Sequence, residues 1–193
     1  MATPTAQVPG AAADLALPTQ IVIFGASGDL TARKLIPAIA DNARQRLFRG
    51  PVQVIGVGRR PMDNALWLAE LERFLTPEQR SIWHELAPNL HYTSVGASTA
   101  ADFAKLAEEL DELAGPFAAT AGRLFYLALK PALFASTVQA LAEQGMLHCD
   151  ALRAEAWRRV VIEKPFGTDL ATAQWLNIVL RQHLREDQIY RID

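Results

Sequence analysis

Residues 20–37 read QIVIFGASGDLTARKLIP, and this stretch decides the fold. Its opening segment, 20–24, is mostly apolar and β-branched, which predicts a strand buried on both faces. A turn with two glycines follows, and from Leu30 onward apolar residues recur at helical spacing until Gly50 and Pro51 stop the pattern. A strand, a glycine turn and a helix in this order begin a βαβ unit.

The rest of the chain continues the alternation of strands and helices. Further strands are predicted at 52–57, 90–95, 123–129, 159–163 and 188–192, and further helices at 76–86, 99–115, 131–144 and 170–184. This order predicts an α/β fold of the Rossmann type, with a doubly wound, mostly parallel sheet and helices on both faces. We expect one domain over residues 19–193, preceded by a flexible tail over residues 1–18 that is rich in Ala, Pro and Thr.

Composition excludes several classes of function. The chain has 19 Lys and Arg against 21 Asp and Glu, so no overall field attracts nucleic acid or an anionic membrane. Cys149 is the single cysteine and the four histidines lack metal-ligand spacing, so we expect neither a disulfide nor a metal site. No apolar run approaches the ~20 residues of a membrane span, and the start does not resemble a signal peptide. A cytoplasmic protein is therefore expected.

The first candidate site is the loop after the first strand, Gly25-Ala26-Ser27-Gly28-Asp29-Leu30. Backbone amides and the helix dipole at such a turn form an anion site that suits a pyrophosphate. Gly25 and Gly28 permit a tight turn, and Ser27 or Asp29 can cap the helix. The spacing is G-x-x-G rather than G-x-G-x-x-G, so a glycine turn that only caps a helix is the alternative.

The second candidate site follows the second strand, where Arg59 and Arg60 stand. NAD-binding sheets usually place a carboxylate here for the ribose hydroxyls, whereas a 2′-phosphate needs a cation. The nearest acid is Asp63, beyond Pro61. Because a guanidinium can donate two hydrogen bonds to a phosphate, the sequence favours NADP over NAD. Two solvated arginines in a polar turn are the alternative.

The third candidate site is Lys164, in the EKPFG string at 163–167 after the fifth strand. At the carboxyl edge of the sheet its ammonium could bind hydroxyl or phosphate oxygens of a substrate. The alternative is an exposed lysine in a turn fixed by Pro165 and Gly167.

Four segments together resemble one family, the glucose-6-phosphate dehydrogenases. They are IFGASGDLTARKLIP at 23–37, RLFYLAL at 123–129, VVIEKPFGTDL at 160–170 and REDQIYRID at 185–193. The resemblance covers the chain from about residue 20 to its last residue, and the EKPFG and REDQIYRID strings carry most of its specificity.

The resemblance implies a role for each candidate residue. Backbone amides between Gly25 and Leu30 would hold the pyrophosphate of NADP, and Arg59 would hold the adenosine 2′-phosphate. Lys164 would contact both the cofactor's nicotinamide end and the sugar phosphate. The peptide bond between Lys164 and Pro165 would be cis. Asp193 would orient a substrate-binding histidine. Phe134 stands where relatives have tyrosine, so we expect it to pack.

The family reaction is the oxidation of glucose 6-phosphate by NADP to 6-phosphogluconolactone, the first step of the oxidative pentose phosphate pathway. The resemblance places the catalytic histidine and its aspartate beyond Asp193, in a C-terminal domain that also forms the homodimer or tetramer. We therefore expect these 193 residues to bind NADP but to contain no catalytic residue, and to expose some apolar surface.

Two other functions remain open. A stand-alone NADP-binding or regulatory module would need Gly25, Gly28 and Arg59, but would have no use for Lys164 and Asp193. A short-chain reductase is disfavoured, because Tyr126 and Lys130 lie in and after a predicted strand rather than four residues apart on a helix.

Overall fold

The computed structural model describes residues 18–48, 50–96, 99–148 and 156–193. The expected tail at 1–18 lies outside these ranges except for Pro18, and so does Cys149. Within the described ranges no helix is long and apolar enough to cross a membrane. No group of three His, Cys, Asp or Glu side chains in the same ranges could hold a metal ion.

A single six-stranded parallel sheet forms the centre of the molecule, in the order β3-β2-β1-β4-β5-β6. The predicted Rossmann-type α/β fold is confirmed. Its strands are β1 (Thr19–Phe24), β2 (Val52–Gly58), β3 (Leu90–Ser94), β4 (Gly122–Leu127), β5 (Arg158–Glu163) and β6 (Ile189–Ile192). β1 pairs with β2 on one side and with β4 on the other. The strand order therefore reverses beside β1, and ligands bind at such reversals in open parallel sheets.

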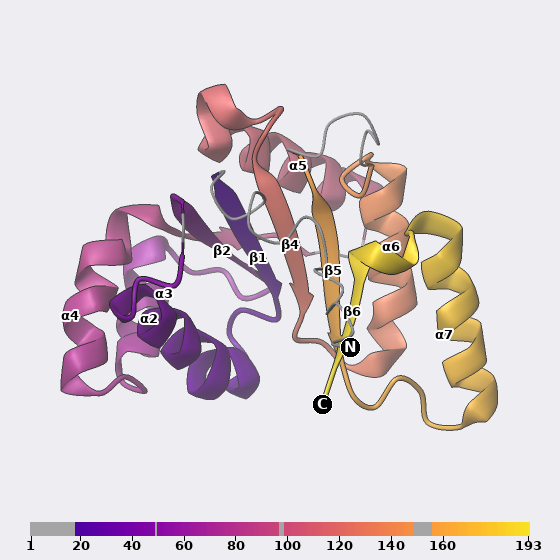
Figure 1. The fold of residues 1–193 in the computed structure, drawn as a ribbon, viewed down its shortest axis with the longest axis horizontal. Coiled ribbons are helices and arrows are strands. Elements are labelled where there is room, and N and C mark those ends of the chain that lie inside the picture. The colour runs from indigo at the N-terminus through magenta and orange to yellow at the C-terminus, as the bar shows by residue number, and fades with distance from the viewer. Residues whose placement is uncertain (1–17, 49, 97–98, 149–155) are drawn as a thin grey trace, which may run out of the picture.

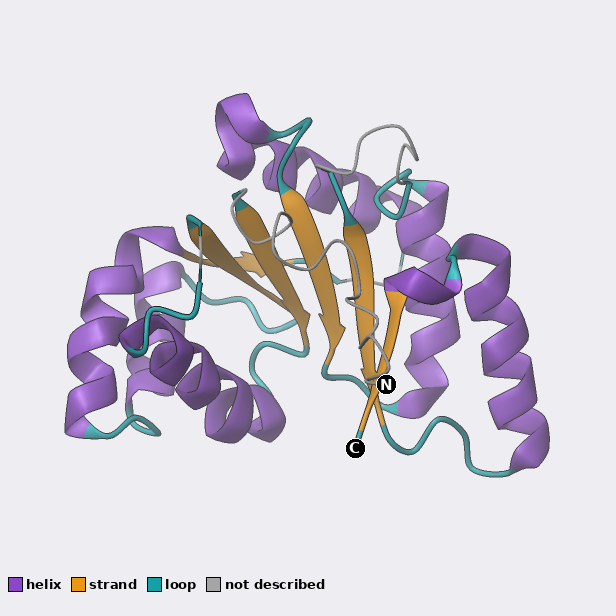
Figure 2. Ribbon diagram, in the orientation of Figure 1, coloured by secondary structure: helices purple, strands orange, loops and turns teal. Residues whose placement is uncertain are grey.

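Helices cover both faces of the sheet (Figures 1 and 2). The helices that follow β1 and β2 are α2 (Ile36–Arg44), α3 (Asn64–Glu72) and α4 (Pro77–Leu86). Those that precede β4, β5 and β6 are α5 (Ala100–Ala114), α6 (Phe134–Glu143) and α7 (Leu170–His183). Short 3₁₀ turns lie at Ala87–Asn89, Gly115–Phe117, Pro131–Leu133 and Glu186–Gln188.

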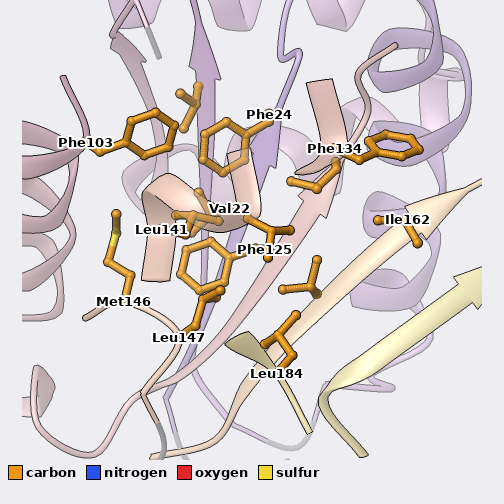
Figure 3. Close-up of a cluster of buried hydrophobic side chains, with 14 of the residues drawn as sticks. Val22, Phe24, Phe103, Phe125, Phe134, Leu141, Met146, Leu147, Ile162 and Leu184 are labelled. Atoms are coloured by element: carbon orange, nitrogen blue, oxygen red, sulfur yellow. The ribbon is translucent and has the colours of Figure 1, made fainter. Parts of the chain in front are cut away.

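Two hydrophobic clusters form the core, one on each face of the sheet. Because side chains alternate along a strand, Val22 and Phe24 of β1 belong to the cluster under α5, α6 and α7, shown in Figure 3. Ile21 and Ile23 belong to the cluster under α2, α3 and α4. Every residue of β1 is buried, which confirms a strand covered on both faces. Phe134 is 1% exposed in the first cluster, so it packs as expected.

The predicted helix starts at Thr76 and Thr99 are confirmed. Both threonines form capping boxes, in which the hydroxyl accepts the third amide of the helix while the side chain there accepts the amide of the threonine. Asp169 caps α7 in the same way.

The first helix differs from its prediction at both ends. Residues Thr31–Leu35 form a π-helical turn before α2 begins. α2 then ends at Arg44, although the apolar spacing was expected to continue to Gly50, and Leu47 is 55% exposed. The cause is a turn at Arg46 (φ 54°), where the amides of Leu47 and Arg46 donate to the carbonyls of Asn42 and Ala43. This pattern closes a helix by satisfying its last carbonyls.

On the α2, α3 and α4 side, the sheet carries an apolar pocket of about 290 Å³. Phe48, Trp157 and Tyr190 line it together with strand residues Thr19, Ile21, Val52, Leu124, Arg159 and Val161. The pocket lies toward the amino ends of β1, β2 and β4, because these strands contribute early residues to its wall.

Candidate functional site

The predicted site residues gather at the carboxyl edge of the sheet. The glycine loop follows β1, Arg59 follows β2, Lys164 follows β5 and Asp193 follows β6. Parallel strands end on the same side, so the loops that follow them share one edge, which includes the reversal beside β1.

Gly25 is required by the backbone of the glycine loop. Its φ is +85°, and a Cβ built there would lie 2.2 Å from the carbonyl oxygen of Ala128. The amides of Gly25 and Ala26 donate to the carbonyl of Val57 at 3.0 and 3.1 Å, which anchors the loop to the end of β2. The Thr31 hydroxyl donates to the carbonyl of Gly25 at 3.0 Å and holds the loop from its other end.

The loop leads directly into the first helical turn. Ser27, Gly28 and Asp29 are exposed, whereas Ala26 is buried. The first amides of a helix have no acceptor within it, so those of Asp29 and Leu30, with that of Ser27 before them, could donate to an anion. The Gly28 amide already donates to the carbonyl of Gly25 at 2.9 Å. The Ala26 amide likewise donates to Val57, and the Ala26 methyl lies close to Gly56. The carboxylate of Asp29 is paired with Arg33 at 3.3 Å.

Trp67 forms the wall behind the loop. Its indole N–H donates to the carbonyl of Ala26 at 3.0 Å, and a Cβ at Gly56 would lie 2.5 Å from its ring. Trp67 is 1% exposed and packs in the core cluster under α2, α3 and α4. Beside it lies a hollow of about 150 Å³, lined by loop residues Ala26, Ser27, Gly28, Asp29 and Ala32 and by Trp67, Glu70, Leu71, Arg73 and Phe74.

The two adjacent arginines after β2 have different environments. Arg59 is exposed, and within the described ranges its guanidinium has no hydrogen-bond or ion-pair partner. The Arg60 guanidinium donates to the carboxylate of Glu70 on α3, and this contact raises the pKa of Arg60. The Arg60 carbonyl accepts a hydrogen bond from the Tyr92 hydroxyl at 2.8 Å. Asp63, the nearest acid in the sequence, caps α3 by accepting the amide of Leu66 at 2.8 Å.

Lys164 and Asp193 lie together although 29 positions separate them in the chain. The Lys164 Nζ donates to the Asp193 Oδ2 at 2.6 Å, and both side chains are mostly exposed. The Lys164 amide donates to the carbonyl of Ile192 at 3.2 Å, because β5 and β6 are neighbours. The peptide bond between Lys164 and Pro165 is cis, which confirms that expectation.

The sequence assigned no role to the side chains of three residues at this edge, Tyr126, Glu163 and Glu70. Tyr126 is buried and donates its hydroxyl to Glu163, the residue before Lys164. Burial and this hydrogen bond raise the pKa of Tyr126 above its ordinary value. Glu70 on α3 was not considered either. A signal existed for Tyr126 and Glu163, since each is a polar residue near the end of an apolar parallel strand, where sites form.

Comparison with known protein families gives one match over most of the chain. The family described as "Glucose-6-phosphate dehydrogenase, NAD binding domain" matches residues 22–193.

Curated relatives share this match. The glucose-6-phosphate 1-dehydrogenase of Aggregatibacter actinomycetemcomitans is 35% identical over 176 residues, which is 90% of this chain and 35% of the relative. That of Treponema pallidum (strain Nichols) is 38% identical over 182 residues, or 91% of this chain and 35% of the relative. The chain thus spans about a third of the length of these relatives.

Solved structures give the same result. A structure of glucose-6-phosphate dehydrogenase in complex with its substrate glucose-6-phosphate matches with a TM-score of 0.79 and 30% identity. It covers 91% of this chain and 36% of that protein. A crystal structure of glucose-6-phosphate 1-dehydrogenase from Mycobacterium avium matches with a TM-score of 0.76 and 30% identity, covering 92% of this chain and 36% of that protein.

Proposed function

Because the chain belongs to the glucose-6-phosphate dehydrogenase family and corresponds to its NAD-binding domain, we propose that it is the NADP-binding part of an enzyme that oxidises glucose 6-phosphate. The choice of NADP rests on the surroundings of two residues after β2, Arg59 and Asp63. Arg59 presents an exposed guanidinium there, while the nearest acid, Asp63, is used as a helix cap. A carboxylate at this position would repel a 2′-phosphate, and a guanidinium attracts it.

The residues of the edge fit a dinucleotide. The amides at Ser27, Asp29 and Leu30 would hold the pyrophosphate, Gly28 would let it approach the backbone, and Gly25 lets the chain turn close to Ala128. Bound NADP would supply the hydride acceptor. The resemblance assigns the catalytic base to a part of the family outside residues 1–193, so these residues are proposed to bind cofactor and not to turn over substrate alone.

Lys164 and Asp193 support an enzyme rather than a stand-alone binding module. Their side chains meet at 2.6 Å on the proposed nicotinamide side of the site. The Lys164 ammonium would bind the sugar phosphate, while Asp193 would orient the substrate-binding histidine that the family places next. A module that only bound NADP would have no use for this pair.

We further propose a cytoplasmic enzyme of the oxidative pentose phosphate pathway, with glucose 6-phosphate as its substrate partner and without nucleic acid or membrane partners. The near balance of 19 basic and 21 acidic residues supports the part of this proposal that concerns nucleic acid and membranes.

The test is a calorimetric titration of the 193-residue chain with NADP and, separately, with NAD. We expect saturable NADP binding, weakened about ten-fold or more by Arg59→Ala, because a charge-assisted contact to the 2′-phosphate is lost. NAD binding should change little in the same variant. Arg80→Ala, on the exposed surface of α4, is the matched control and should bind as the wild type does.

Two results would contradict the proposal. One is a folded chain that binds neither dinucleotide. The other is an Arg59→Ala variant that loses NADP and NAD affinity equally, since the 2′-phosphate is the only difference between the two cofactors.

A further inference from the structure

The two guanidinium groups at the end of β2 are adjacent in sequence but held differently. The Arg59 side chain is exposed and has no partner within the described part of the chain. The Arg60 side chain reaches the Glu70 carboxylate on α3, ten positions further along. Only one of two neighbouring cations is therefore left to an incoming anion.

Two contacts fix Arg60 in this position, one through its carbonyl and one through its guanidinium. The Tyr92 hydroxyl donates to the Arg60 carbonyl at 2.8 Å, which holds the backbone. The Tyr92 ring lies 5.6 Å from the Trp67 ring, and a Cβ at Gly58 would lie 2.5 Å from the Tyr92 hydroxyl oxygen. The missing side chain at Gly58 thus makes room for Tyr92. The Glu70 carboxylate, 27% exposed, pairs with the Arg60 guanidinium.

Glu70 is also close to the glycine loop. It lines the hollow of about 150 Å³ that is also lined by Ser27, Gly28 and Asp29. The carboxylate that withdraws Arg60 therefore lies on the cofactor side of α3.

We propose that Glu70 is a specificity-determining residue, which limits the preference for NADP over NAD by withdrawing Arg60 from the 2′-phosphate. This inference rests on the proposed function. A phosphate binds better to two guanidinium groups than to one, because each planar fork supplies its own pair of donors. A guanidinium already paired with a carboxylate offers neither its full charge nor all its donors. The pair consequently limits the discrimination between the cofactors.

The test compares Glu70→Gln with Glu72→Gln in calorimetric titrations with NADP and NAD. Glu72 lies two positions further on α3 and pairs with His84 at 3.2 Å, so Glu72→Gln makes the same change of charge on the same helix. We expect Glu70→Gln to tighten NADP binding about five-fold and to leave NAD binding within about two-fold, as suits a partly exposed charge contact. Glu72→Gln should leave both affinities unchanged.

The double variant Glu70→Gln, Arg60→Ala tests whether the released arginine is the cause. The gain in NADP affinity should disappear in it. A gain that persists without Arg60 overturns the inference, because the effect would then come from the Glu70 charge alone. Unchanged NADP affinity in Glu70→Gln overturns it as well, provided that circular dichroism shows the variant to be folded.

These outcomes are separable from a failure of the proposed function. The proposed function fails if the wild-type chain binds no NADP or if Arg59→Ala has no selective effect. The inference about Glu70 fails alone if wild-type binding depends on Arg59 while Glu70→Gln changes nothing.

Discussion

At the scale of single residues, Tyr126 is a polar group that the fold keeps away from water. Its hydroxyl donates to Glu163, and the next residue, Lys164, leads into the cis peptide bond. Burial and the hydrogen bond to Glu163 both favour the protonated phenol and raise the pKa of Tyr126 from its ordinary value of 10.0. The hydrogen bond thus ties the end of β5 to β4 beside the proposed substrate lysine.

This raised pKa predicts a loss of stability in alkali. Below pH 10.0 the tyrosine is protonated in folded and unfolded chains alike, and its contribution to stability is complete. Above that pH the unfolded chain releases the proton while the folded chain keeps it, so unfolding becomes more favourable as pH rises. Urea unfolding from about pH 9 to about pH 11 should therefore show a steeper loss of free energy in the wild type than in Tyr126→Phe.

At neutral pH the same variant should lose about 1 kcal/mol of unfolding free energy, because the hydrogen bond to Glu163 is removed. Tyr92 is the control, since its pKa is also raised, chiefly by burial, and Tyr92→Phe should remove a separate part of the alkaline slope. Equal slopes in Tyr126→Phe and the wild type would contradict the prediction.

At the scale of elements, the sequence predicted a strand or helix correctly where the pattern of apolar residues agreed with the residues that begin or end the element. The apolar run at 20–24 and the threonine caps at Thr76 and Thr99 each predicted an element that the structure contains. The six strands and their alternation with helices then identify the fold.

Helix α3 was not predicted, and its composition explains why. Apolar residues occur on all sides of Asn64–Glu72, so the sequence has no single apolar stripe that would indicate a helix there. Asp63 was noted only as the nearest acid after the second strand, although its position also suits a helix cap. Glu70, which lies on this helix, was missed for the same reason. Contacts between α3 and the end of β2 depend on tertiary packing, which local patterns do not contain.

The capping box at Thr99 makes a prediction for α5, which packs Phe103, Leu106 and Leu110 onto the sheet. Thr99→Ala should lower the free energy of unfolding by about 1 kcal/mol, because the hydroxyl no longer accepts the Asp102 amide. Thr99→Ser keeps that oxygen and should stay close to the wild type. Urea denaturation measures both, and equal losses in the two variants would assign the effect to the lost methyl group instead.

At the scale of the whole molecule, the two faces of the sheet differ in what they leave accessible. The helices α5, α6 and α7 bury the larger cluster, whereas the opposite face retains the apolar pocket of about 290 Å³. Tyr190 on the edge strand β6 is 43% exposed at the rim of this pocket. Apolar surface of this kind binds apolar ligands. The family resemblance implied that the chain would expose some apolar surface.

We expect the native chain to enhance the fluorescence of the anionic apolar dye ANS at this pocket. Tyr190→Asp should reduce the enhancement, because it removes an aromatic wall and adds a charge that repels the dye. Trp175→Asp is the matched control, since Trp175 is 58% exposed on α7 and does not line the pocket. An equal reduction in both variants would mean that the dye binds exposed aromatic residues in general.

The position of Trp67 gives the molecule an optical reporter of its own. Indole emission responds to hydrogen bonding and to nearby polar groups, and this indole is bonded to Ala26, inside the loop proposed to hold the pyrophosphate. Trp83, on α4, is equally buried but does not line that hollow, so it supplies a constant background. Occupation of the glycine loop should therefore shift the emission spectrum of the unlabelled protein, and the shift should vanish in Trp67→Phe.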